Sequence, residues 1–255
     1  MNIIKKYIKK HLFKMKLFQM ASISYCINQE LLPKIIVNTP SNSLRKTFGL
    51  PFCEHTSQLN QDVFALISNK FKSGYFLEIG ANDGFTLSNT VYLEECFNWS
   101  GILVEPNPAF LPSLKKRKAK LSCKAVANID GVIEFIDAGL FGGIASTIDS
   151  SYKRDTSEAP IIEVEATSLE KILKEHSAPS VIDYISIDVE GGEIAILEQM
   201  CALKDYRFSC GSIEHNHRKN GVKNYKQLLE SANYQIVWAD QTSFDLFFID
   251  KLKCS

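Results

Sequence analysis

Acidic side chains stand directly after three apolar, strand-like runs of this sequence, and they are its clearest chemical signal. Glu105 follows Gly-Ile-Leu-Val, and Glu214 follows Cys-Gly-Ser-Ile. Asp188 and Glu190 come after Tyr-Ile-Ser-Ile and are followed at once by two glycines. Ligands of open α/β sheets bind outside the carboxyl ends of the strands, so we expect these carboxylates to gather at one site. Two acids so close together are costly unless a ligand amine, a sulfonium or a divalent metal compensates them, although a helix dipole explains Glu190 equally well.

Two of the five histidines, His215 and His217, stand just beyond Glu214. An imidazole titrates near neutral pH, so His215 is a candidate general base, as are Asp188 and Glu190. Asp188, Glu190, Glu214 and a histidine would also be plausible metal ligands. No contiguous ligand motif supports a metal, however, and a metal role would require the three carboxylates to converge. We therefore predict no metal site from the sequence.

A glycine-containing turn follows the apolar run Tyr-Phe-Leu-Glu-Ile. Gly80 and Gly84 are separated by Ala-Asn-Asp, so Asn82 stands where a dinucleotide fingerprint has its middle glycine. The acids Glu78 and Asp83 flank the turn and would repel a pyrophosphate, whereas they would favour a cationic ligand. This pattern resembles the first motif of S-adenosylmethionine-dependent methyltransferases.

Glu105 lies 21 residues beyond Gly84, at the distance where an acid receives ribose hydroxyls. An NAD-dependent enzyme would carry the same acid. The spacing therefore indicates a ribose without choosing the cofactor.

An ordered series of motifs between residues 57 and 250 resembles the FkbM family of methyltransferases. The motifs are Ser57-Gln58, Gln61-Asp62, residues 74–84, Ser88-Asn89-Thr90, Leu93-Glu94, residues 99–101, residues 105–108, Ser146-Thr147, residues 183–191, Glu193 and Glu214-His215-Asn216. The series is far more specific than a single glycine turn.

The resemblance implies a Rossmann-like class I methyltransferase fold and transfer of a methyl group from S-adenosylmethionine to an oxygen, with a small-molecule or carbohydrate acceptor. It places Glu105 on the ribose and Asp188 between cofactor and acceptor. In our leading hypothesis, the loop at 138–160, with Ser146 and Thr147, would help to form the acceptor site. The residues that would line the methionine part of the cofactor are Glu78, Gly80, Asn82 and Gly84. A metal-dependent or NAD-type enzyme on the same sheet, and an inactive membrane-associated interaction module, remain alternatives.

Apolar runs that alternate with helical patterns predict an α/β domain built on a mostly parallel, seven-stranded sheet that ends in an antiparallel hairpin. The expected strands are residues 75–79, 101–104, 122–127, 132–137, 161–166, 181–188, 208–213, 234–239 and 244–250. The expected helices are residues 57–71, 88–97, 111–120, 168–176, 193–203 and 223–232, with the charges of 111–120 facing solvent. We assign residues 53–255 to the methyltransferase domain and residues 1–52 to a basic amphipathic helix and an irregular connector that covers 33–57.

Six lysines precede the first acidic residue, Glu30, and the rest of the chain carries an equal surplus of acids. An acidic body argues against a nucleic-acid partner. The basic segment at 1–29 is interpreted as a helix that packs on the domain or on a second copy of the chain, as a peripheral membrane contact, or as a targeting peptide. Seven scattered cysteines without a Cys-x-x-Cys pair fit buried thiols in a reducing compartment, so we expect a cytoplasmic protein, or one at a membrane surface.

Overall fold

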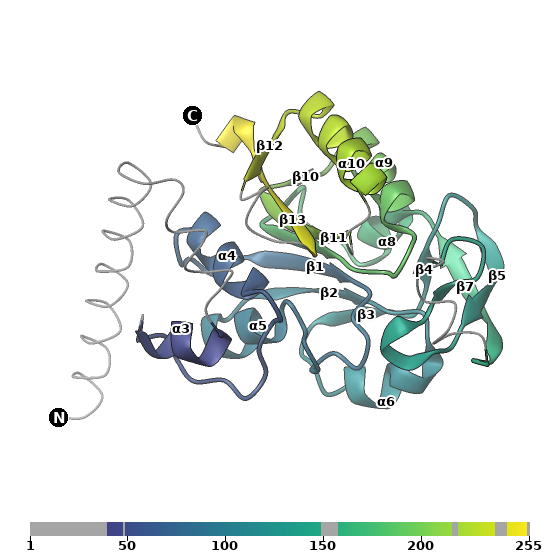
Figure 1. Ribbon diagram of the computed structural model, residues 1–255, viewed down its shortest axis with the longest axis horizontal. Coiled ribbons are helices and arrows are strands. Elements are labelled where there is room, and N and C mark those ends of the chain that lie inside the picture. Colours follow the sequence, from purple (N-terminus) through teal and green to yellow (C-terminus); the bar gives the residue numbers. More distant parts are fainter. Residues whose placement is uncertain (1–39, 48, 149–157, 216–218, 238–243, 254–255) are drawn as a thin grey trace.

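The computed structural model describes residues 40–47, 49–148, 158–215, 219–237 and 244–253 (Figure 1). The basic segment at 1–29 lies outside the described residues. None of the helices in the described part has the length and apolar character that crossing a bilayer requires.

A seven-stranded sheet forms the centre of the fold, in the order β12-β13-β11-β9-β1-β2-β3. The strands are β1 (Tyr75–Ile79), β2 (Ser100–Val104), β3 (Lys120–Ser122), β9 (Tyr184–Ile187), β11 (Cys210–Glu214), β12 (Tyr234–Val237) and β13 (Asp245–Asp250). All neighbours are parallel except β13, which runs antiparallel to both β11 and β12. The predicted fold class is therefore confirmed.

The register of the four central strands brings their carboxyl ends level. Ile79 of β1 pairs with Val104 of β2 and with Ile187 of β9, and Ile187 pairs in turn with Ile213 of β11. The next residue along each strand is therefore at the same edge of the sheet. Those residues are Gly80, Glu105, Asp188 and Glu214.

Helices cover both faces of this sheet (Figure 1). One layer holds α3 (Ser41–Thr47), α4 (Gln61–Ser68) and α5 (Val91–Phe97), and the other holds α8 (Leu169–Glu175), α9 (Glu193–Ala202) and α10 (Lys219–Ser231). Successive residues of a strand point to opposite faces, so in β1 Leu77 packs into one apolar cluster and Phe76 into the other. Ser168 caps α8 by accepting a hydrogen bond from the backbone N–H of Lys171.

Residues 40–52 pack against the domain. The sequence predicts an irregular connector here, but α3 is helical, and Leu44 and Leu50 belong to the buried cluster on the α4 side. Arg45 forms a buried ion pair with Asp62 and lies 3.6 Å from the ring centre of Tyr92. Burial of Leu44 and pairing of Arg45 stabilise a helix that its short polar residues alone do not predict.

A smaller four-stranded sheet, in the order β4-β7-β5-β6, is inserted between β3 and α8. Its strands are β4 (Ala125–Val126), β5 (Gly131–Ile136), β6 (Gly143–Ile144) and β7 (Ile161–Thr167), and they bury a separate cluster around Phe135 and Val164. The predicted strand at 122–127 is thus divided, because Ser122 pairs with Val104 whereas Ala125 pairs with Ala166. Likewise, the strand predicted at 181–188 is two strands: β8 (Val181–Ile182), which pairs with β10 (Arg207–Phe208), and β9.

The basic run after Leu111 forms only a short helix, α6 (Leu111–Leu114). The prediction of a solvent-facing helix to Lys120 is wrong, and Arg117 is buried. Its guanidinium is 3.0 Å from a Glu94 oxygen and also donates to the carbonyl of Gly84 and the hydroxyl of Thr90. The chain turns back after α6 because Arg117 ties it to α5 and to the turn after β1.

We expect Arg117→Ala to lower the free energy of unfolding by roughly 3–5 kcal/mol, because it leaves the buried Glu94 carboxylate without its charged partner. The neighbouring Lys118→Ala should change it by less than about 0.5 kcal/mol, since that side chain is exposed. Urea denaturation of both variants measures the difference. Equal losses would show that Arg117 has no special structural role.

Candidate active site

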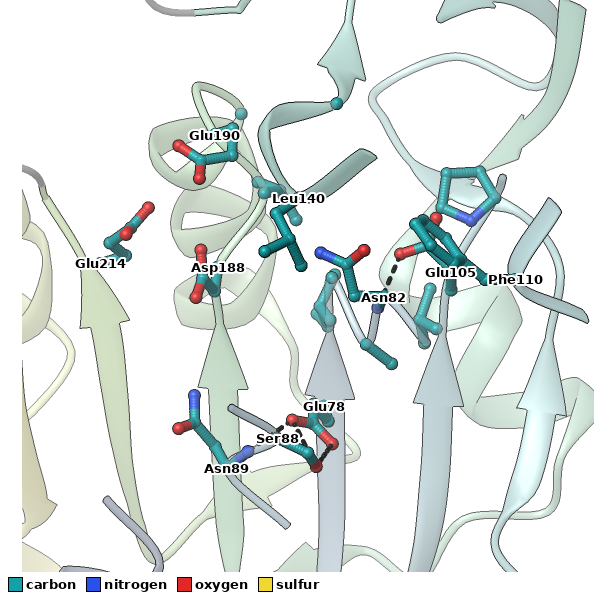
Figure 2. A pocket seen from close by; sticks show the side chains of 18 of the residues that line it. Glu78, Asn82, Ser88, Asn89, Glu105, Phe110, Leu140, Asp188, Glu190 and Glu214 are labelled. Carbon is teal, nitrogen blue, oxygen red and sulfur yellow. Dashed lines mark hydrogen bonds between the residues drawn. The ribbon is translucent and has the colours of Figure 1, made fainter. Parts of the chain in front are cut away.

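A cavity of about 370 Å³ opens at the carboxyl edge of β1, β2, β9 and β11 (Figure 2). The small sheet closes its other side through Phe135, Leu140 and Phe141. Of the site residues predicted from the sequence, the structure brings together along this cavity Glu78, Gly80, Asn82, Glu105, Asp188 and Glu190.

The turn after β1 is held between β2 and β9. Gly80 and Ala81 both donate to the backbone oxygen of Val104, at 3.0 and 3.1 Å. Gly80 has a φ of +86°, and a Cβ atom there would overlap the backbone oxygen of Asp188. Only glycine combines this left-handed conformation with so close an approach of two backbones.

Asp83 stabilises the far side of this turn. Its carboxylate accepts hydrogen bonds from the backbone N–H groups of Phe85 and Thr86, at 2.8 and 2.7 Å. Partial burial alone would raise the pKa of Asp83, but these hydrogen bonds lower it below its usual value. Asp83 therefore has a structural role in this turn.

Glu78 is buried and anchors the start of α5. Its oxygens accept from the Ser88 hydroxyl, the backbone N–H of Asn89 and the Thr90 hydroxyl. Burial raises the pKa of Glu78 despite the nearby Arg117 and these donors. The side chain lines the cavity, but its hydrogen bonds are directed at the protein (Figure 2).

The structure differs from the sequence-based assignment at two residues. Gly84 is not among the cavity-lining residues: its carbonyl accepts from Arg117, and a Cβ atom there would be 3.0 Å from Leu114. His215 is also outside the lining set, and its backbone N–H donates to the oxygen of Phe244 at 2.7 Å. The structure therefore does not place His215, one of the predicted candidates for general base, in the cavity wall.

Glu105 is buried beside the turn. One carboxylate oxygen accepts from the backbone N–H of Asn82 at 3.0 Å, and the other accepts from that of Asn107 at 2.8 Å. Burial, with a smaller contribution from Asp137, raises the pKa of Glu105 to about 7. Each oxygen keeps a further lone pair for a ligand.

Three carboxylates converge opposite Glu105. Ligand oxygens of Asp188, Glu190 and Glu214 all lie within 4.8 Å of one another (Figure 2). Burial and the neighbouring acids raise the pKa of Glu214 to about 11 and that of Asp188 to about 7. Asp245, which accepts from Gln61 at 2.8 Å, extends this group, and burial and Asp188 raise its pKa to about 7. The cavity thus has an acidic end.

Several lining residues had no assigned role in the sequence analysis. Gln58, Gln61 and Asn89 were part of the recognised motifs, so a signal existed for them. Phe110 carried none, because it does not lie next to a strand end of the main sheet. In the loop predicted to form the acceptor site, the residues at 139–142 and Ile144 line the cavity, whereas Ser146 and Thr147 do not.

Comparison with known proteins agrees with this geometry. The sequence profile of the family described as "Methyltransferase FkbM domain" matches residues 78–236. No curated protein matches the chain significantly.

The solved structures to which this chain is similar include the following three. The methyltransferase FkbM from Methylobacillus flagellatus KT is 12% identical, with 81% of this chain and 69% of that chain covered and a TM-score of 0.46. An O-methyltransferase from Bacillus cereus in complex with SAH is 12% identical, with coverages of 90% and 96% and a TM-score of 0.45. The magnesium protoporphyrin IX methyltransferase from Synechocystis PCC 6803, with bound SAM, is 8% identical, with coverages of 88% and 97% and a TM-score of 0.41.

Gly80→Ala should reduce the free energy of unfolding by roughly 2–5 kcal/mol, because it adds left-handed strain to an overlap with the backbone of Asp188. Gly139→Ala is the matched control: its φ is +61°, and a Cβ atom there meets nothing within 4 Å. Gly139→Ala should reduce the free energy of unfolding by only about 1–2 kcal/mol, because it adds the left-handed strain without an overlap. Thermal or urea unfolding compares them, and equal losses would contradict a close contact between the turn and β9.

Proposed function

Because the chain belongs to the FkbM family of methyltransferases, we propose that it transfers the methyl group of S-adenosylmethionine to a hydroxyl oxygen of a small molecule or a carbohydrate. The observation that carries the proposal is the position of Glu105 and the Gly80 turn at one end of a cavity whose other end is acidic.

The residues at the turn fit this cofactor. Gly80 lines the cavity, and the absence of a side chain lets the turn lie directly against the backbone of Asp188. Glu105 has lone pairs available for two ribose hydroxyls. The side-chain oxygen of Asn82 is buried at the cavity and has no hydrogen-bond partner among the described residues, so it can accept from an ammonium group.

The acids also favour a sulfonium cofactor over NAD. Asp188 and Glu190 line the same cavity as the turn after β1, where a pyrophosphate would have to bind. A diphosphate would add negative charge to a group of carboxylates that already repel one another, whereas a sulfonium and an ammonium reduce that repulsion.

When bound, S-adenosylmethionine supplies a methyl group activated by its positive sulfur. The acceptor oxygen forms a bond to the methyl carbon while the carbon–sulfur bond breaks and its electron pair stays on sulfur. Asp188 or Glu190 can accept the hydroxyl proton that is lost, because both line the cavity. For Asp188, the raised pKa also suits a proton acceptor near neutral pH. The protein contributes further by aligning the two reactants.

Both polar and apolar groups surround the acidic end of the cavity. Gln58 and Gln61 offer amide groups, and Leu87 and Phe244 offer partly exposed apolar surface. This mixture suits a hydroxyl-bearing acceptor with an apolar face. The surplus of acids outside residues 1–29 disfavours a nucleic-acid acceptor.

Calorimetry with three ligands tests the cofactor. We expect S-adenosylmethionine and S-adenosylhomocysteine to bind and NAD to give no heat, because the turn has no middle glycine and its surroundings are acidic. Binding of NAD without either sulfur compound would overturn the proposal.

Glu105→Gln should weaken S-adenosylhomocysteine binding about tenfold or more, because a hydrogen bond to a charged group contributes roughly 1.5–3 kcal/mol. The wild-type protein should also bind adenosine, which has the ribose and no ammonium, about tenfold more tightly at pH 8 than at pH 6. The reason is that a carboxyl with a pKa of about 7 becomes the better acceptor on losing its proton.

The exposed Glu134→Gln is the control for both measurements, since that carboxyl is far from the turn in the small sheet. It should retain the wild-type affinity and pH dependence. If Glu105→Gln behaved like Glu134→Gln, the ribose assignment would be lost.

A further inference from the structure

Three acidic side chains reach one point from separate segments of the chain. Asp188 directly follows β9, Glu214 ends β11, and Glu190 is in the turn that leads to α9 (Figure 2). Glu190 has a φ of 57°, a left-handed conformation that is uncommon outside glycine and that orients this residue toward the other two. Their oxygens lie within 4.8 Å of one another.

This spacing suits a small divalent cation. Ligand oxygens around an octahedral Mg²⁺ with bonds of about 2.1 Å lie roughly 3–4 Å apart, so a modest adjustment of the side chains is sufficient. Carboxylate oxygens are hard ligands, which favour Mg²⁺ or Mn²⁺ over softer metals.

A buried amide gives an independent indication of a ligand at this end of the cavity. Asn89 is only 6% exposed, and its nitrogen donates to the Ser186 hydroxyl at 2.8 Å. Its oxygen is buried and has no hydrogen-bond partner among the described residues, although it lines the same cavity as the three acids. A buried acceptor that lacks a hydrogen bond is costly to the folded state.

The orientation of Asn89 connects it with the acids. Figure 2 shows the amide nitrogen of Asn89 on the side of Asp188 and the amide oxygen turned toward the strand that ends at Glu214. An oxygen on this side can accept a hydrogen bond from one of the water molecules that Mg²⁺ usually keeps. One oxygen of Glu214 is likewise buried without a hydrogen-bond partner in the described part of the chain.

We propose that Asp188, Glu190 and Glu214 bind a divalent metal ion, with Asn89 contacting one of its waters. The site itself depends only on these residues. Its role rests on the proposed function: the ion would hold the acceptor hydroxyl at the acidic end of the cavity and lower the pKa of that hydroxyl. With the ion bound, Asp188 and Glu190 act as ligands, and the hydroxyl proton passes to water.

Binding of Mn²⁺ to the full chain, measured by electron paramagnetic resonance after treatment with a chelator and without cofactor, tests the site. We expect one bound ion per chain at submillimolar Mn²⁺, competed by Mg²⁺. Glu190→Gln should weaken binding at least tenfold, and Asn89→Ala severalfold. Circular dichroism and thermal unfolding check that each variant is folded.

The control is the double variant Glu134→Gln/Glu163→Gln. These carboxylates are also neighbours, as a cross-strand pair between β5 and β7, but they are exposed and do not line the cavity. The control should bind Mn²⁺ within twofold of the wild-type protein.

Absence of Mn²⁺ binding to the wild-type protein, or equal losses in Glu190→Gln and the control, would overturn the metal site. Calorimetry with S-adenosylhomocysteine on the same samples separates the two proposals. If the sulfur compound binds and Mn²⁺ does not, the metal site fails and the methyltransferase function stands. If Mn²⁺ binds at Glu190 and the sulfur compound does not, the metal site stands and the proposed cofactor fails.

Discussion

The level register of β1, β2, β9 and β11 is the constraint on which the site depends. Parallel pairing fixes Ile79, Val104, Ile187 and Ile213 side by side, so the residues that follow them meet at one edge of the sheet. A slip of one residue in any pair would also exchange the two faces of that strand and remove it from its apolar cluster. The packing of the two helical layers therefore maintains the geometry of the cavity.

Charge is distributed unevenly around this edge. The basic side chains that the fold buries are used to pair acids away from the cavity: Arg45 with Asp62, and Arg117 with Glu94. At the cavity, the dominant charged neighbours of Asp188 and Glu214 are other carboxylates. Holding these acids together lowers stability, and a positively charged ligand would recover part of that free energy. This is the pattern expected where a fold retains costly residues for binding.

The sequence predicts the central sheet well and the connections poorly. The sequence predicts both ends of β1 correctly, because a continuous apolar run is followed directly by a glycine turn. The gathering of Asp188, Glu190 and Glu214 followed from the rule about strand ends. By contrast, Arg117 looks like its exposed lysine neighbours until the contact with Glu94 is known, and that contact joins residues 23 apart. The small sheet was missed for the same reason, because its pairing of Ala125 with Ala166 is distant in sequence. Gly84 has the spacing of a ligand-binding glycine, but its neighbour is Leu114.

The contact between the small sheet and the Glu190 turn has a consequence for how such proteins diversify. Gly191 has a φ of 142°, and a Cβ atom there would overlap the backbone oxygen of Thr147. The small sheet has its own apolar cluster and meets the acid-bearing turn backbone to backbone, so few of its side chains are fixed by that contact. Substitutions at Leu140 and Phe141 would therefore change the cavity wall while the backbone contact keeps the acid-bearing turn in position.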